Sequence, residues 1–271
     1  MRAFLVGFLA LAACASDSGN KMPGGGGDTG GDTGGSDMGS DGGGGTTDPS
    51  ARQDYDDTAT IVGANLNVAQ IAAMQASVNL SYGRIPAGFT EDTAGQLATG
   101  TGSMTGSIAG LAATIAYECH DINHVAVPCN GAEDHTRLVL KWTGAVAAAN
   151  MSLDGVNQKG VYYVRYINQG RPMFGGTGTD AFTSTLATGV YTVSYSEASA
   201  HLQFDPTTPA LPSGGTDDFT LTIHRTREGV ADRDFNVNAA LAVTGDDAAT
   251  LTLDGTEVYN LTLSTGVAVH Q

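Results

Sequence analysis

The segment ATLTLDGTEVYNLTL at residues 249–263 contains two runs of alternating apolar and polar residues on either side of an Asp-Gly pair. Leu251 and Leu253 precede the pair, and Val258, Leu261 and Leu263 follow it. An Asp-Gly pair between alternating runs is the sequence signature of a type I′ turn in a β-hairpin. The segment therefore predicts two antiparallel strands joined by a tight turn.

Runs of the same kind recur along the rest of the chain, with Gly, Pro, Asp and Asn between them. They lie at residues 138–142, 146–153, 161–167, 189–195, 200–204 and 219–225. No helical patterns of about 12 residues alternate with them, which argues against a parallel α/β fold. We predict an all-β or mostly β fold, an antiparallel sandwich or open barrel, and the sequence leaves the strand order open.

One segment departs from this pattern. Asn67 followed by Gln70 resembles a capping box, and apolar residues follow without Gly or Pro. We therefore predict one short N-terminal helix over about residues 68–76. The alternation of Val78, Leu80 and Tyr82 predicts a strand directly after it, and residues 90–110 are typical of a loop or a weak edge hairpin.

The N-terminus has the layout of a secretory signal over residues 1–13, with Arg2, an apolar run and small residues before a cysteine. The quartet Leu11-Ala12-Ala13-Cys14 resembles the lipobox of bacterial lipoproteins. The resemblance implies cleavage before Cys14, a diacylglycerol on its sulfur, and a membrane anchor made of lipid. Because Ala15 and not aspartate follows the cysteine, it also implies the outer membrane. Ordinary signal cleavage, which would give a free secreted protein, is the alternative.

Composition divides the remaining chain in two. Residues 14–52 are mostly Gly, Asp, Ser and Thr, which cannot bury a core, so we predict a disordered tether. Residues 53–271 are long enough for a β-rich domain with a substantial core. The net charge of -16 argues against a nucleic-acid partner, because binding phosphates requires clustered Lys and Arg.

Residues 119–135 concentrate the chemistry of the chain. Outside the cytoplasm Cys119 and Cys129 can pair once Cys14 carries lipid, and we favour this disulfide over a thiolate metal site. Three of the six histidines, His120, His124 and His135, lie in the same segment and remain an alternative metal site, although only His120 and His124 have the spacing of a zinc ligand pair. We expect no cofactor.

Other candidates are weaker. Tyr162, Tyr163 and Tyr166, with Trp142 and Tyr191 or Tyr195, can form an exposed platform for a carbohydrate, but we favour a role in the core because Leu and Ile are scarce in these strands. The pairs Asp217-Asp218 and Asp246-Asp247 are typical of solvated turns.

No catalytic motif occurs in the sequence. We therefore expect a lipid-anchored envelope protein whose β domain binds a carbohydrate or protein, or has a structural role, without catalysis. The alternative is a metal-binding protein or metal-dependent enzyme that uses the histidine-rich segment 119–135.

Overall fold

The computed structural model describes residues 49–148, 151–207, 210–245 and 247–271. The signal-like segment 1–13, Cys14 and the predicted tether up to residue 48 lie outside the described residues, and so does Asp246.

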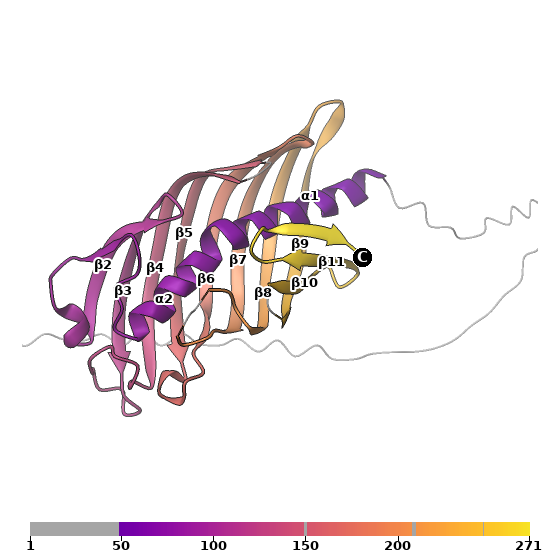
Figure 1. The fold of residues 1–271 in the computed structure, drawn as a ribbon. Helices are drawn as coiled ribbons and strands as arrows, with labels where there is room; N and C mark the ends of the chain where they lie inside the picture. The colour runs from indigo at the N-terminus through magenta and orange to yellow at the C-terminus, as the bar shows by residue number, and fades with distance from the viewer. Residues whose placement is uncertain (1–48, 149–150, 208–209, 246) are drawn as a thin grey trace, which may run out of the picture. The chain divides into compact units, whose positions relative to one another are not determined.

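Twelve strands form one antiparallel sheet in which every strand pairs with its neighbours in sequence, from β1 to β12. The strands are β1 (Phe89–Glu91), β2 (Thr101–Ile108), β3 (Leu111–His120), β4 (His135–Ala148), β5 (Met151–Arg165), β6 (Met173–Leu186), β7 (Gly189–Gln203), β8 (Gly214–Arg227), β9 (Val230–Gly245), β10 (Ala248–Leu253), β11 (Glu257–Thr262) and β12 (Val267–His270). The predicted mostly β class is confirmed. All described strands belong to this one sheet, so of the two predicted arrangements it is the open, curved one and not a sandwich of two sheets (Figure 1).

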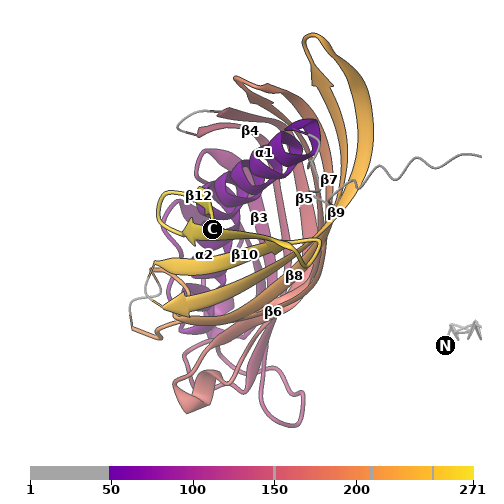
Figure 2. The ribbon, with the colours of Figure 1, turned by 90° about the vertical axis from the view of Figure 1, so that its right-hand side faces the viewer.

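A long helical segment lies along the concave face of the sheet (Figures 1 and 2). It consists of α1 (Pro49–Asn65), a π-helical turn η1 (Leu66–Gln70) and α2 (Ile71–Ser81). The α1 helix contacts β10, β11 and β12, whereas α2 contacts β4, β5 and β6. Short 3₁₀ turns, η2 (Gln96–Ala98) and η3 (Ile167–Gln169), lie in loops.

The helix differs from its prediction in length. It covers residues 68–76 but begins at Pro49, four residues before the predicted start of the domain, and continues to Ser81. The strand predicted from Val78 to Tyr82 is therefore wrong. The reason is burial: strands from different parts of the curved sheet contact the helix, and none of its residues from 51 to 81 is exposed, so its apolar residues do not form the single stripe of a surface helix.

Close backbone approach fixes where α1 meets the C-terminal strands. A Cβ at Gly63 would lie 2.2 Å from the carbonyl oxygen of Gly266, which precedes β12. Only a residue without a side chain fits this contact.

The hairpin at residues 249–263 is confirmed. Asp254 and Gly255 have φ angles of 48° and 74°, as a type I′ turn requires, and the Thr256 amide donates a hydrogen bond to the Leu253 carbonyl at 3.1 Å. The run predicted as one strand at 146–153 is wrong, because β4 ends at Ala148 and β5 begins at Met151. Small and apolar residues on both sides conceal the boundary between these two strands in the sequence.

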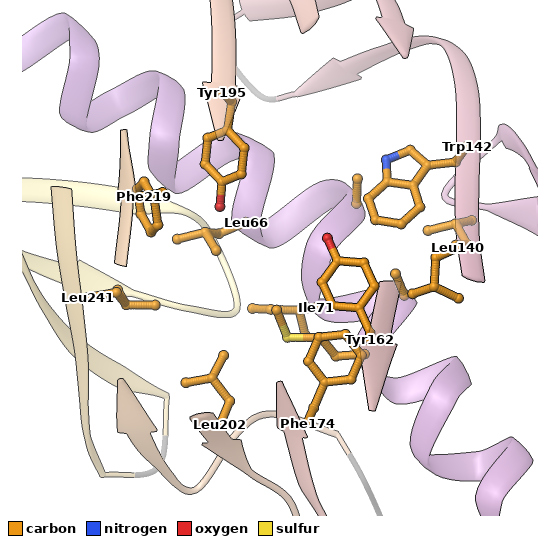
Figure 3. Close-up of a cluster of buried hydrophobic side chains, with 14 of the residues drawn as sticks. Leu66, Ile71, Leu140, Trp142, Tyr162, Phe174, Tyr195, Leu202, Phe219 and Leu241 are labelled. Atoms are coloured by element: carbon orange, nitrogen blue, oxygen red, sulfur yellow. The ribbon is translucent and has the colours of Figure 1, made fainter. Parts of the chain in front are cut away.

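The core lies between the helix and the concave face. Inward residues of the strands, among them Leu140, Trp142 and Phe219, face Leu66 and Ile71 of the helical segment (Figure 3). Among the described residues, no helix combines the length and apolarity needed to cross a bilayer.

Candidate functional site

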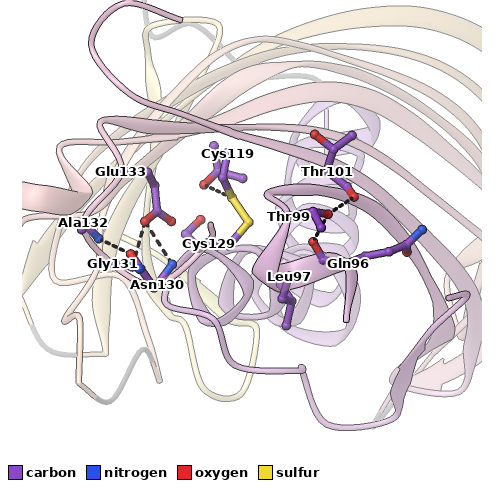
Figure 4. Close-up of a disulfide and its surroundings, with 12 residues drawn as sticks. Gln96, Leu97, Thr99, Thr101, Cys119, Cys129, Asn130, Gly131, Ala132 and Glu133 are labelled. Atoms are coloured by element: carbon purple, nitrogen blue, oxygen red, sulfur yellow. Dashed lines mark hydrogen bonds between the residues drawn. A yellow bond between two sulfur atoms is a disulfide. The ribbon is translucent and has the colours of Figure 1, made fainter. Parts of the chain in front are cut away.

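A disulfide joins Cys119, near the end of β3, to Cys129, as predicted (Figure 4). Both cysteines are buried. The Val127 amide donates to the Cys119 carbonyl at 3.0 Å, and the Cys129 amide donates to the Leu97 carbonyl at 3.0 Å. The loop between the cysteines is therefore held at both ends, and closing it contributes about 3 kcal/mol to stability in the chain-entropy model.

A buried carboxylate orders the segment that follows the disulfide. Oε2 of Glu133 accepts hydrogen bonds from the amides of Asn130 and Gly131, at 3.2 and 2.8 Å (Figure 4). Burial raises the pKa of Glu133 above its usual value, and the backbone amides oppose this shift. Glu133 therefore holds in place the backbone that leads into His135.

The fold brings the three candidate histidines together. His120 and His135 are direct partners across β3 and β4, and their rings stack with centroids 5.2 Å apart. His124, in the disulfide loop, lies edge-on to His135 with centroids 5.3 Å apart. The three rings meet because His135 opens the strand that pairs with the end of β3.

The arrangement of the rings is not that of a metal centre. Zinc ligands point their nitrogens at one atom from about 2.0–2.1 Å, and stacked rings do not. Within the described ranges no group of three or more His, Cys, Asp or Glu side chains is arranged to hold a metal ion. Nδ1 of His135 instead lies 3.1 Å from a carboxylate oxygen of Asp134.

The imidazoles of His124 and His135 line a pocket of about 400 Å³, which we call the histidine pocket. Its lining is His124, Asp134, His135, Tyr163, Arg165 and Tyr166. The Arg165 guanidinium lies 5.2 Å from the centroid of the Tyr163 ring. Tyr166 is 44% exposed and has a left-handed backbone with φ of 58°. The pocket therefore presents two aromatic rings beside groups of both charges and imidazoles.

The residues predicted for the aromatic platform lie in two places, the core and the histidine pocket. Trp142, Tyr162, Tyr191 and Tyr195 are buried, as expected for core residues. Tyr163 and Tyr166, by contrast, line the histidine pocket. Tyr163 lies on the outward side of β5, and η3 follows Tyr166 directly.

Sequence reasoning missed a group of buried acids on the concave face. This carboxyl cluster consists of Asp180 on β6, Glu197 on β7 and Asp217 on β8, all at most 3% exposed. The expectation that Asp217 is a solvated turn residue is wrong, because it occupies an inward position of β8, whereas Asp218 is exposed. Asp247 is a half-buried turn residue whose carboxylate accepts hydrogen bonds from Ser264, so its place in a turn is as expected. Side chains two residues apart in a strand lie on the same face, so the apolar Phe219 is the signal that could have identified Asp217 as inward.

Burial dominates the electrostatics of the carboxyl cluster. It raises the pKa of Asp180 to about 6 and that of Glu197 to about 7. Burial and the Glu197 charge raise the pKa of Asp217 well above its usual value. The Tyr162 hydroxyl donates to Glu197 Oε2 at 2.6 Å and accepts from Gln158 Nε2 at 2.9 Å. None of the described ion pairs includes a member of this cluster.

A second buried group attaches the helix to the sheet. In this arginine cluster, Asp54 and Asp57 of α1 pair with Arg225 and Arg227 of β8, all at 3.0 Å, and Arg233 of β9 reaches Asp54 at 3.3 Å. Its aspartates and arginines pair with one another, which indicates a structural role.

Comparison with known proteins gives no relative. No protein-family model matches the chain. No curated protein and no solved structure matches it either.

Proposed function

We propose that the protein is a lipid-anchored component of the outer membrane whose β domain binds a carbohydrate without catalysis, in the histidine pocket. The lipobox-like quartet ending at Cys14 and the Gly-rich segment after it support the anchor and the tether. The composition of the histidine pocket is the observation that supports a carbohydrate as the ligand. Aromatic rings pack against the apolar faces of sugars, while carboxylate, imidazole and guanidinium groups hydrogen-bond sugar hydroxyls.

Binding of the full chain to a panel of immobilised oligosaccharides tests the ligand. We expect selective binding that Tyr166→Ala and Tyr163→Ala each weaken about tenfold or more, since each ring contributes contact area at low conformational cost. Val190→Ala is the control, because Val190 is similarly exposed, at 39%, on another hairpin. Equal loss in the control, or no selective binding, would contradict the proposal.

The anchor is tested separately by labelling cells with a radioactive fatty acid and fractionating their membranes. We expect the label in the outer membrane with the wild-type protein and none with Cys14→Ala. Zinc titration addresses the alternative function: a rise in melting temperature that His120→Ala and His124→Ala abolish would favour a metal-binding protein instead.

A further inference from the structure

The convex face of the sheet carries two adjacent lysines, Lys141 and Lys159. At the level of the pair Lys141 and Lys159, one row of outward side chains crosses eight strands through direct cross-strand partners. The row is Thr105, Thr114, Lys141, Lys159, Thr179, Ser196, Thr220 and Asn238, and it contains no acidic residue.

The two lysines of this row face each other directly. Lys141 on β4 and Lys159 on β5 are Cα partners, and both are exposed. Side chains in this position have Cβ atoms about 4.5–5.5 Å apart, and like charges there are destabilising. The chain has 28 acidic and 12 basic residues, yet neither lysine takes part in a described ion pair. A concentrated positive charge on an acidic protein requires an explanation beyond folding.

The lysines border a hollow of about 500 Å³ in the convex face, which we call the lysine pocket. Val139 and Val161 provide apolar walls, and Thr177, Thr179 and Ser196 provide hydroxyl groups. Glu197 also lines the hollow, but its side chain is buried and accepts a hydrogen bond from the Tyr162 hydroxyl on the opposite face of the sheet. Gly160 and Gly178, which are cross-strand partners, also line it.

Packing on the opposite face of the sheet requires these two glycines. A Cβ at Gly178 would lie 2.0 Å from the hydroxyl of Tyr162, and one at Gly160 would lie 2.3 Å from the Tyr162 ring. Register shifts in the pairing of β5 with β6 and of β6 with β7 occur beside them and bend the sheet. Packing on the opposite face therefore fixes the backbone of the two glycines that line the hollow.

We propose that the lysine pocket binds a phosphate group carried on a sugar-sized molecule. A phosphate monoester carries about -1.5 to -2 charges at neutral pH, which two ammonium groups neutralise. Lysine binds phosphate as a point charge, and the three hydroxyls can hydrogen-bond its oxygens. The volume exceeds that of a phosphate, and Val139 and Val161 offer contact to the group attached to it. The source is a soluble sugar phosphate or the headgroup of a phospholipid, and the site is separate from the histidine pocket.

The test uses the full mature chain carrying Cys14→Ser, which removes the sulfur of the proposed lipid, made in an oxidising compartment. Titration calorimetry with glucose 1-phosphate at low salt measures soluble binding. We expect saturable binding that Lys159→Gln weakens about tenfold and that the double variant K141Q/K159Q abolishes, because each charge-assisted hydrogen bond is lost. Arg171→Gln, which removes one exposed positive charge from a loop outside the lysine pocket, is expected to bind like the wild type.

Vesicles of phosphatidylcholine with and without phosphatidic acid distinguish the lipid source. Binding only to the vesicles with phosphatidic acid, lost in the double variant, assigns a lipid headgroup; binding only of glucose 1-phosphate assigns a soluble ligand. No binding of either probe overturns the proposal, as does equal loss in Arg171→Gln. Folding is controlled independently: without ligand, Lys159→Gln should melt no lower than the wild type, because it relieves a like-charge pair.

Discussion

Two groups of buried carboxyls lie on the concave side of the same sheet and are neutralised in opposite ways. In the arginine cluster, Asp54 and Asp57 of the helix are paired with guanidinium groups from β8 and β9. In the carboxyl cluster, Glu197 and Asp217 have Tyr162 and one another as polar neighbours. A buried charge is tolerated when it is paired, and otherwise the group takes up a proton.

The two clusters therefore differ in their roles. The arginine cluster connects the helix to the sheet, whereas the carboxyl cluster takes up or releases protons as the pH changes. Arginine keeps its charge at all accessible pH values, so the first cluster is a permanent connection between helix and sheet. In the second cluster Glu197, with its pKa of about 7, exchanges its proton near neutral pH. The same face of the sheet therefore combines a fixed and a titratable group.

The largest expected effect comes from breaking the arginine cluster. Arg225→Met leaves Asp54 buried with less positive charge, and we expect a loss of about 3–5 kcal/mol in the free energy of unfolding. Urea unfolding at pH 7 measures it. Arg165→Met is the matched control, because Arg165 is exposed and forms none of the described ion pairs. A loss of less than about 1 kcal/mol would mean that the cluster does not hold the helix.

The next effect is a pH dependence that belongs to the carboxyl cluster. The pKa of Glu197 rises from 4.5 to about 7 on folding, so between these pH values the folded state holds a proton that the unfolded state has released. Stability is then full below about pH 4 and falls as the pH rises through 7, by about 1–3 kcal/mol. Thermal unfolding from pH 5 to pH 8 measures this slope. Glu197→Gln should flatten it, and an unchanged slope would assign it to other groups.

A smaller effect distinguishes the tyrosines of the two clusters. Tyr162→Phe removes the donor to Glu197 and the acceptor for Gln158, which should cost about 1–2 kcal/mol. It should also move the pH midpoint upward, since that hydrogen bond lowers the pKa of Glu197. Tyr191→Phe is the comparison: Tyr191 donates to Asp57, which Arg227 also contacts, so its loss should cost less and leave the pH midpoint unchanged. Chemical unfolding at several pH values checks both.

The smallest effect concerns the edge of the arginine cluster. The Arg233 side chain is 46% exposed, and Asp54 keeps both Arg225 and Arg227 without it. We expect Arg233→Gln to cost about 0–1 kcal/mol and the cost to shrink at high salt, as for other exposed ion pairs. A cost close to that of Arg225→Met would mean that the three arginines act as one unit.

The sequence predicted local features well and partnerships poorly. The Asp254-Gly255 hairpin needs only neighbouring residues, and the disulfide followed from a count of cysteines. The helix was predicted too short at its N-terminal end, because Asp54 and Asp57 resemble the polar tether in composition and are stabilised by arginines about 170 residues later. Asp217 was misplaced for a related reason, since a pair of aspartates is read as solvated unless its register in the strand is known.

By itself, then, the sequence determined the antiparallel β class, the tight turn at residues 254–255 and the grouping of Cys119, Cys129 and the nearby histidines. These features depend on residues close in the chain, whose spacing is visible in sequence. The tertiary structure decided that one curved sheet encloses a long helix, that burial raises the pKa values of three acids on the concave face, and that Lys141 faces Lys159 on the convex side. Register and curvature arise from contacts between distant strands, and a shift of one residue would reverse which side chains are buried.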